Sequence, residues 1–360
     1  MRLALKELLH SRKKYLLVEI IVVLMMFMVL LLSGLVQGLG RAVSSGVETM
    51  DADTFVMSDD SEKLLTVSSL TDDEYSQVKS EYGNRATTID IQRMYLEKDS
   101  STEKVDVTYF AIDPEKFLNP DVYEGERLST GENEVVLDDS FESDGISVGD
   151  TVKDASSGIE LKVVGFTKDK MYGHVAVAYV STDTYRAMML EVNPMYKDTV
   201  HAVAVQGAAG AQIDGTAAYT KAEVVQAIPG YQAEQMTITM VEWLLVVITA
   251  VIIGIFFFVI NLQKEKEFGV MKAIDTSTAR LTRFIICQVF LIAASGAVVA
   301  CALVALMSSF LPASMPFYLV WGDVATVLVA FVLISILSSL ASIARVVRID
   351  PAKIIGGDFQ

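Results

Sequence analysis

Residues 15–40, YLLVEIIVVLMMFMVLLLSGLVQGLG, form an apolar run of 26 residues in which Glu19 is the single charged residue. A helix needs about 20 mostly apolar residues to cross the hydrocarbon core of a bilayer. Because lipid offers no hydrogen-bond partners to the backbone, such a run must be helical. The run is longer than the roughly 7–15 apolar residues of a cleavable signal peptide. It therefore predicts a retained membrane helix.

Three further apolar runs follow, at residues 236–262, 284–311 and 324–344. Between the first and second runs lie 195 residues, 41–235, of mixed and mostly polar character. The sequence predicts an α-helical polytopic membrane protein with four transmembrane helices in a 1+3 plan. A mixed α+β extracytoplasmic domain would separate helices one and two.

Basic residues set the expected orientation. They gather before the first run (Arg2, Lys6, Arg12, Lys13, Lys14), between the second and third (Lys264, Lys266, Lys272, Arg280, Arg283) and after the fourth (Arg345, Arg348, Lys353). The positive-inside rule places all three groups in the cytoplasm. Residues 41–235 are then outside, and they hold 36 Asp and Glu against 16 Lys and Arg. So acidic a domain argues against nucleic acid as a partner.

These patterns divide the chain into segments with defined expectations. The segments are a cytoplasmic amphipathic helix at 1–14, transmembrane helix 1 at 15–40, the extracytoplasmic domain at 41–235, helix 2 at 236–262, a cytoplasmic loop at 263–283, helix 3 at 284–311, an outer loop at 312–323, helix 4 at 324–344 and a cytoplasmic tail at 345–360. Met1, Leu5, Leu8 and Leu9 fall on one face of the first segment. An equally good interpretation is that this segment only sets the orientation of the first helix in the membrane.

The extracytoplasmic segment shows both helical and strand patterns. Thr71 and Glu74 form a capping-box pattern that predicts a helix through about residue 82. Alternating and β-branched runs predict strands. They lie at 87–96, 105–112, 134–137, 159–166 and 174–180, with a helix around 182–191.

Residue types that carry enzyme chemistry are scarce in this chain. It has no H-E-x-x-H motif and no Walker A sequence, and the extracytoplasmic segment has no cysteine. His174 and His201 are 27 residues apart, which is no metal-ligand spacing. Cys287 and Cys301 lie in the third run, where small buried apolar residues are expected. The chain is therefore expected to have no catalytic site, no intrinsic cofactor and no ATPase activity of its own.

Several strings resemble a known family. EVVLDDSF (134–141), VGDTVKD (148–154), LKVVGFT (161–167), EKEFGVMKAID (265–275) and RIDPAKIIGG (348–357) resemble the permease subunits of mechanotransmission-type (MacB/FtsX-like) ABC transporters. SGLVQGLG (33–40), MYGH (171–174), GYQAEQ (230–235) and MPFYL (315–319) are similar to the haem-exporting permeases of the haem-regulated transporter system of Gram-positive bacteria. Asp275 departs from the glycine usual in the cytoplasmic loop.

The resemblance implies a haem site at outer-leaflet depth. Its residues would be Glu234, Tyr231, Met28, Met240 and Tyr172, with Glu234 and Met28 as candidate ligands of the haem iron. A carboxylate near hydrocarbon is costly, and thioethers can ligate haem iron. The alternatives are a hydrated interfacial carboxylate, an aromatic belt residue and methionines that only pack. Ser33, Gly34 and Gly38 would permit close approach of a planar ligand or of another helix in a dimer.

The resemblance also implies a coupling helix after the second run. Phe268, Met271 and Ile274 would contact a separate ATPase subunit, although ordinary juxtamembrane charge is the alternative. The expected protein is a homodimeric permease in the cell membrane that takes haem from the outer leaflet and expels it, driven by ATP bound to its partner. A permease for peptides or lipoproteins remains open, as does a non-transporting transducer that controls a cell-wall hydrolase or sensor kinase.

Overall fold

The computed structural model describes residues 12–98, 104–210, 212–274, 276–311 and 316–347, which divide into two compact units. The helical unit comprises the chain up to Gly38 and from Thr237 onward, and the sheet unit comprises Leu39–Met236. The amphipathic helix expected at 1–14 lies mostly outside the described residues. The string at 348–357 and Asp275 lie wholly outside them.

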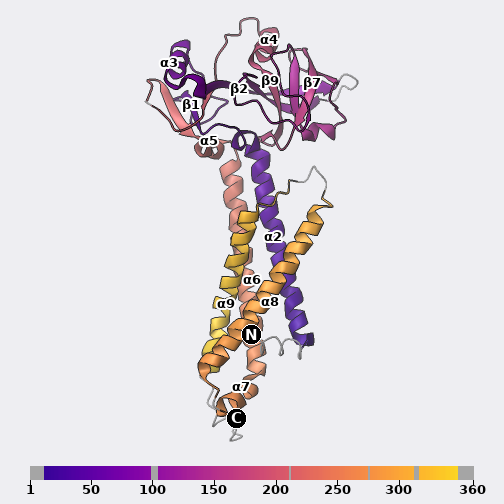
Figure 1. The fold of residues 1–360 in the computed structure, drawn as a ribbon, viewed down its shortest axis with the longest axis vertical. Helices are drawn as coiled ribbons and strands as arrows, with labels where there is room; N and C mark the ends of the chain where they lie inside the picture. The colour runs from indigo at the N-terminus through magenta and orange to yellow at the C-terminus, as the bar shows by residue number, and fades with distance from the viewer. Residues whose placement is uncertain (1–11, 99–103, 211, 275, 312–315, 348–360) are drawn as a thin grey trace. The chain divides into compact units, whose positions relative to one another are not determined.

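Long helices form the helical unit (Figure 1). They are α2 (Arg12–Glu48), α6 (Tyr231–Gln263), α8 (Thr278–Ser308) and α9 (Trp321–Val347), with the short α7 (Glu265–Ala273) after α6. The first residues of α6 and the last residues of α2 belong to the sheet unit. Each predicted apolar run is helical, but α2 continues past residue 40 and α8 begins before residue 284.

Three of these helices are long and apolar enough to cross a membrane, judged over the described residues. Their apolar spans are Tyr15–Glu48, Tyr231–Ile260 and Thr278–Ser308, while α9 offers the shorter stretch Trp321–Leu337. The fourth crossing therefore stays a prediction.

Close packing of α2 on α8 builds the core of the helical unit. Tyr15, Val18, Val22 and Met26 recur every three to four residues and form one buried stripe of α2. Gly296 of α8 meets this stripe, since a Cβ there would lie 2.6 Å from Cγ1 of Val22. Hydrophobic transfer does not drive association within lipid, so small residues that allow close contact hold such helices together.

The sheet unit contains one large sheet and short helices. Its strands are β1 (Thr54–Ser58), β2 (Ala86–Lys98), β3 (Lys104–Ile112), β4 (Glu124–Gly125), β5 (Glu134–Asp138), β6 (Thr151–Asp154), β7 (Glu160–Thr167), β8 (Met171–Tyr172), β9 (Val175–Ser181), β10 (Ala202–Val205) and β11 (Thr216–Thr220). Its helices, apart from the ends of α2 and α6, are α3 (Asp72–Tyr82), α4 (Thr182–Val192) and α5 (Lys221–Ala227), with 3-10 turns η1 (Gly83–Arg85) and η2 (Asp139–Glu142).

Within the described residues the strand order is β11-β1-β10-β2-β3-β9-β5-β7-β4, with β6 against β2 and β7 and with β8 against β9. The pairs β3·β9 and β5·β7 are parallel, and the other pairs are antiparallel. Successive side chains of a strand point to opposite faces. Along β3, Phe110 and Ile112 accordingly enter one buried cluster while Val107 and Tyr109 enter another. Both faces of the central strands are therefore covered.

The end of α2 packs on one face of this sheet. Val43 and Val47 of α2 share a buried cluster with Phe110 and with Val224 of α5. Tyr231, the first residue of α6, packs against the same cluster. The last turns of α2 and the first turn of α6 are thus fixed to the same side of the sheet.

A candidate ligand site where the matched strings meet

The β8–β9 hairpin is fastened to α2 by its turn. Gly173 and His174 form the turn with φ of +56° and +64°, a left-handed pair typical of two-residue hairpins. The Gly173 N–H donates to the carbonyl of Val43, and the His174 N–H donates to the carbonyl of Ala42, both at 2.9 Å. A hairpin turn usually points to solvent, but the backbone of this one is bonded to a helix.

Further contacts extend along the same stripe of α2. The Met171 N–H donates to Oγ of Ser45 at 3.0 Å, and Lys170 donates to the hydroxyl of Thr49. A Cβ at Gly46 would lie 2.9 Å from the carbonyl oxygen of Met171. Positions 42, 45, 46 and 49 lie on one helix face, so the whole hairpin follows one stripe of α2.

The hairpin also reaches the first turn of α6. His174 Nε2 lies 3.0 Å from Oε1 of Glu234, and the two side chains are 47% and 38% exposed. The second oxygen, Oε2 of Glu234, is buried and has no hydrogen-bond partner among the described residues. Sequence reasoning set His174 aside because its spacing from His201 fits no metal site. The signal it missed was the position of His174 beside Gly173 in a matched string.

The two tyrosines of the predicted site are held in different ways. The Tyr231 hydroxyl is hydrogen-bonded to the side chains of Ser44 and Glu48 of α2. The Tyr172 ring packs edge-on against Phe110 with centroids 5.8 Å apart. Burial raises the pKa of Tyr172 to about 12, partly offset by a hydrogen bond with Thr66. Tyr172 therefore stays protonated at neutral pH and supports the hairpin, and its contact with haem stays a prediction.

A glycine of the string at 33–40 touches the string at 230–235. A Cβ added at Gly40 would lie 2.2 Å from Nε2 of Gln235, so the absence of a side chain lets α6 begin beside α2. Gly40 at the end of the string 33–40 and the strings at 171–174 and 230–235 thus meet inside the sheet unit.

The fourth string meets the first inside the helical unit. A Cβ at Gly34 would lie 2.3 Å from the Phe317 ring, and one at Gly38 would lie 2.1 Å from the carbonyl oxygen of Pro316. The Tyr318 N–H donates to the Gly34 carbonyl at 3.0 Å. On the side to which their Cβ atoms would point, Gly34 and Gly38 are thus covered by the chain's own residues 316–318. Close approach of a planar ligand or of another helix to these glycines stays a prediction.

The remaining predicted residues belong to the helical unit. Ser33 is buried and hydrogen-bonded to Glu242. Met28 of α2 is 46% exposed and Met240 of α6 is 66% exposed. Tyr231, Glu234 and Tyr172 are therefore gathered in one unit, whereas the methionines lie in the other.

The residues predicted to contact an ATPase do not share one surface. Phe268 is 1% exposed and packs in the core of the helical unit, with Met271 against the same cluster. The expectation that Phe268 offers its ring to a partner is therefore wrong, because the ring fills the chain's own core. The exposed apolar side chains here are those of Val270 and Ile274, at 53% and 72%.

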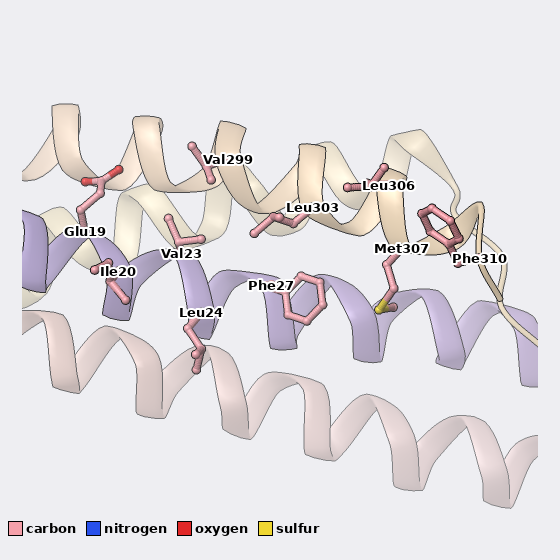
Figure 2. Close-up of a pocket in the computed structure, with 10 residues that line it drawn as sticks. All are labelled: Glu19, Ile20, Val23, Leu24, Phe27, Val299, Leu303, Leu306, Met307 and Phe310. Atoms are coloured by element: carbon pink, nitrogen blue, oxygen red, sulfur yellow. The ribbon is translucent and has the colours of Figure 1, made fainter.

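A separate apolar groove of about 610 Å³ lies between α2 and α8 (Figure 2). Its lining residues are Glu19, Ile20, Val23, Leu24, Phe27, Val299, Leu303, Leu306, Met307 and Phe310. Figure 2 shows Glu19 at one end, with Met307 and Phe310 at the other. None of the predicted haem residues lines this groove. Its mostly apolar lining would accept any apolar ligand and does not select haem.

One enzyme-like pattern is set aside by its context. Residues 145–149, GISVG, match the letters G-x-S-x-G, which in hydrolases place serine on a strand-to-helix turn. Here Ser147 is exposed in a loop before strand β6, and its N–H donates to Asp150. Nor do three or more His, Cys, Asp or Glu side chains gather as a metal site in the part of the chain that the structure describes.

Comparison with known proteins gives consistent matches over the whole chain. Residues 16–223 match the MacB-like periplasmic core domain, and residues 238–351 match the FtsX-like permease C-terminal region. The chain is 28% identical to a putative hemin transport system permease protein HrtB of Staphylococcus haemolyticus, over 99% of each chain. The HrtB protein of Staphylococcus epidermidis gives the same identity and coverage.

More distant matches have no assigned substrate. An uncharacterized ABC transporter permease of Mycobacterium tuberculosis, Rv0072, is 25% identical over 96% of this chain and 97% of its own. Among solved structures, the extracellular domain of the noncanonic ABC-type transporter YknZ from Gram-positive bacteria is 18% identical, with a TM-score of 0.31. The match covers 43% of this chain and 82% of that domain.

Proposed function

Because the chain belongs to the MacB/FtsX-type permeases of ABC transporters, we propose that it is the permease subunit of a haem exporter. It takes haem laterally from the outer leaflet of the cell membrane and expels it. ATP is bound and hydrolysed by a separate subunit, two copies of which act on a permease homodimer. The basic segments and both termini face the cytoplasm, and the sheet unit lies outside.

The observation that carries this proposal is the convergence of the strings at 33–40, 171–174 and 230–235 around Glu234. Strings that resemble haem exporters lie far apart in the sequence, yet His174, Gly40 and the first turn of α6 are in direct contact. Full-length similarity to two putative hemin transport permeases supports the same substrate.

The chemistry of the site suits haem. Haem is a flat apolar ring with two propionates and an iron atom that accepts ligands. We assign the carboxylate of Glu234, whose side chain is 38% exposed, to the iron. In this proposal Tyr231 contacts the ring, and the roles of Met28 as a second ligand and of Met240 stay predictions from the sequence.

In this proposal the contact with the ATPase is made by α7 and the residue that follows it. We assign Val270 and Ile274, the exposed apolar residues of this segment, to the contact with the ATPase. Phe268 and Met271 instead anchor α7 in the core of the helical unit. Movement of α7 is thereby passed directly to the packed helices.

Titration of the purified permease–ATPase complex with haem tests the proposal. Wild-type protein should bind haem with a saturable change in absorption, and Glu234→Ala should weaken binding at least tenfold. The matched control is Glu191→Ala, which removes another exposed carboxylate of the sheet unit. If wild-type protein binds no haem, a peptide or lipoprotein permease or a transducer becomes the better assignment. If Glu234→Ala binds haem like wild type, the assignment of Glu234 to the iron is wrong.

A further inference from the structure

We propose that the groove between α2 and α8 binds one chain of a membrane phospholipid whose headgroup carries a primary ammonium, and that Glu19 recognises this headgroup. The inference goes beyond the proposed function and does not depend on haem being the substrate. All residues that line the groove belong to the helical unit.

The groove has one charged end and apolar walls. Glu19 is the single charged residue among those that line it, and Figure 2 shows this residue at one end. Met307 and Phe310 lie at the other end, and the lining residues between the two ends are all aliphatic or aromatic. A molecule with a polar head and an apolar chain matches this order.

The length of the groove matches one lipid chain. Its lining residues in α8 run from Val299 to Met307, about 12 Å at roughly 1.5 Å per residue, and Phe310 extends the wall beyond them. Half of the hydrocarbon core of a bilayer is about 15 Å thick, and the chains of one leaflet fill this depth. A single chain whose head lies at Glu19 therefore extends to the far end of the groove.

Glu19 lies at a depth that a lipid headgroup can reach. It is the fifth residue of the apolar run 15–40, so its Cα lies about 6 Å along the helix from the start of that run. Side chains of a helix are tilted toward its N-terminus. The carboxyl group is therefore directed back toward the polar end of the run and away from the middle of the bilayer.

Among the side chains that the structure describes, no cation pairs with Glu19, and the partner of its carboxylate is the Ser295 hydroxyl. That hydroxyl has one proton, and the Leu291 carbonyl competes for it at a distance of 2.6 Å from Oγ. An ionised carboxylate accepts about four hydrogen bonds, and its charge is costly near hydrocarbon. A primary ammonium supplies the opposite charge and three N–H donors.

The apolar walls alone would not select an occupant. Within a bilayer the surrounding lipid chains are as apolar as the groove, so hydrophobic transfer gives no preference among them. Any preference must therefore come from Glu19, which attracts a cationic headgroup and repels an anionic one. A second copy of this chain in the groove would exclude lipid altogether, so the two occupants give different results in an experiment.

The test uses the permease–ATPase complex in lipid nanodiscs, with a tryptophan reporter and lipids brominated on their chains. Trp243 and Trp321 are replaced by Phe, and Leu306→Trp places the reporter in the groove. Bromine quenches tryptophan fluorescence on contact. Phosphatidylethanolamine should reach the reporter about tenfold more effectively than phosphatidylglycerol with the same chains, the equilibrium equivalent of one charge-assisted hydrogen bond.

Three further variants make the result specific. Glu19→Gln keeps the shape of the side chain and removes its charge, so both lipids should then quench equally. Leu24→Trp places a reporter on the opposite wall of the groove and should reproduce the preference seen with Leu306→Trp. Ile255→Trp is the matched control, an exposed apolar position of α6 outside the groove, and should show no headgroup preference.

Four results would overturn the inference. Equal quenching by the two lipids at both groove reporters would show that Glu19 does not select the headgroup. A preference that persists in Glu19→Gln would assign recognition to another group. Quenching by neither lipid would show that protein, such as a second copy of the chain, fills the groove. An equal preference at Ile255→Trp would reflect the lipid around the whole protein. Haem is absent throughout, so none of these results bears on the proposed function.

Discussion

Nζ of Lys264 donates a hydrogen bond of 3.0 Å to the hydroxyl of Tyr15, although the two residues are 249 positions apart. The amide of Gln288 donates to the same oxygen at 3.2 Å, and all three side chains are buried. Lys264 directly precedes α7, Tyr15 lies near the start of α2 and Gln288 lies in α8. This polar cluster ties the segment assigned to ATPase coupling to two long helices.

Removing the shared oxygen tests the importance of that cluster. Tyr15→Phe should lower the free energy of unfolding of the helical unit by about 1–3 kcal/mol, the cost of leaving buried donors without their acceptor. The Lys264 amine also lies 5.3 Å from the Tyr15 ring centroid, and Phe keeps this cation–π contact. Tyr15→Ala should therefore be clearly worse than Tyr15→Phe.

Thermal unfolding of the detergent-solubilised permease measures both variants. Tyr95→Phe is the control, because it removes a hydroxyl from a tyrosine that is 48% exposed in the sheet unit. Equal stability of wild type and Tyr15→Phe would mean that the cluster does not stabilise the helical unit.

Substitution of exposed apolar residues tests the assignment of α7. Val270→Asp and Ile274→Asp should prevent co-purification of the ATPase while the permease still folds, because burial of each side chain is worth roughly 1.5–3 kcal/mol. Leu190→Asp is the matched control, an exposed apolar residue of α4. Recovery of the ATPase at the wild-type level with both variants would contradict the assignment.

Phe268 should behave in the opposite way. Its ring is buried, so Phe268→Ala should cost about 3–5 kcal/mol of stability, as large-to-small changes in packed cores do. A fully stable Phe268→Ala permease that fails to recruit the ATPase would return Phe268 to the partner surface.

The glycines of α2 provide a third test. Gly38→Ala should destabilise the helical unit, because the new Cβ would lie 2.1 Å from a backbone oxygen of Pro316 and the segment 316–318 would have to move. Gly322→Ala is the control, since the Cβ it would add meets nothing within 4 Å beyond its chain neighbours and the nearby backbone of its own helix. Melting temperatures of the two variants should differ by several degrees; equal values would show that residues 316–318 yield at no cost.

Local patterns in the sequence predicted much of the fold but little of the site. The capping box at Thr71 and Glu74 is confirmed, since both of its hydrogen bonds involve residues three positions apart. Strand β3 was predicted from its β-branched run, whereas β10, only four residues of alanine and valine, was missed. An apolar run of four residues is too short to show the periodicity that distinguishes a strand from a helix.

The contacts that build the site depend on tertiary structure. His174 and Glu234 are 60 residues apart, and Pro316, the partner of Gly38, lies beyond α8 in the sequence. A glycine pattern indicates that something approaches closely but does not identify the approaching group. Likewise, the helical spacing of Phe268 and Ile274 could not tell which of them faces the chain's own core.

Asp138 provides a prediction about pH. This side chain is buried, and burial raises its pKa to about 6, although hydrogen bonds from Ser140 and from the Lys170 N–H at 2.6 Å oppose the shift. Its ordinary value is 3.8, so the folded state holds the proton more tightly than the unfolded state between these values. Protonation of Asp138 therefore favours folding, and this contribution is lost as the pH rises through about 6.

The size of the effect follows from the shift. Each unit of pKa difference corresponds to about 1.4 kcal/mol, so the contribution of Asp138 should fall by roughly 2–2.5 kcal/mol between pH 4 and pH 7. Asn does not titrate, and Asp138→Asn should lack this fall. Urea unfolding of both proteins, followed by the strand signal in circular dichroism, measures the difference in stability at each pH. Asp144→Asn, at an exposed position, should follow the wild-type curve. A difference between wild type and Asp138→Asn that stays constant from pH 4 to pH 7 would show that Asp138 titrates as an ordinary carboxyl group.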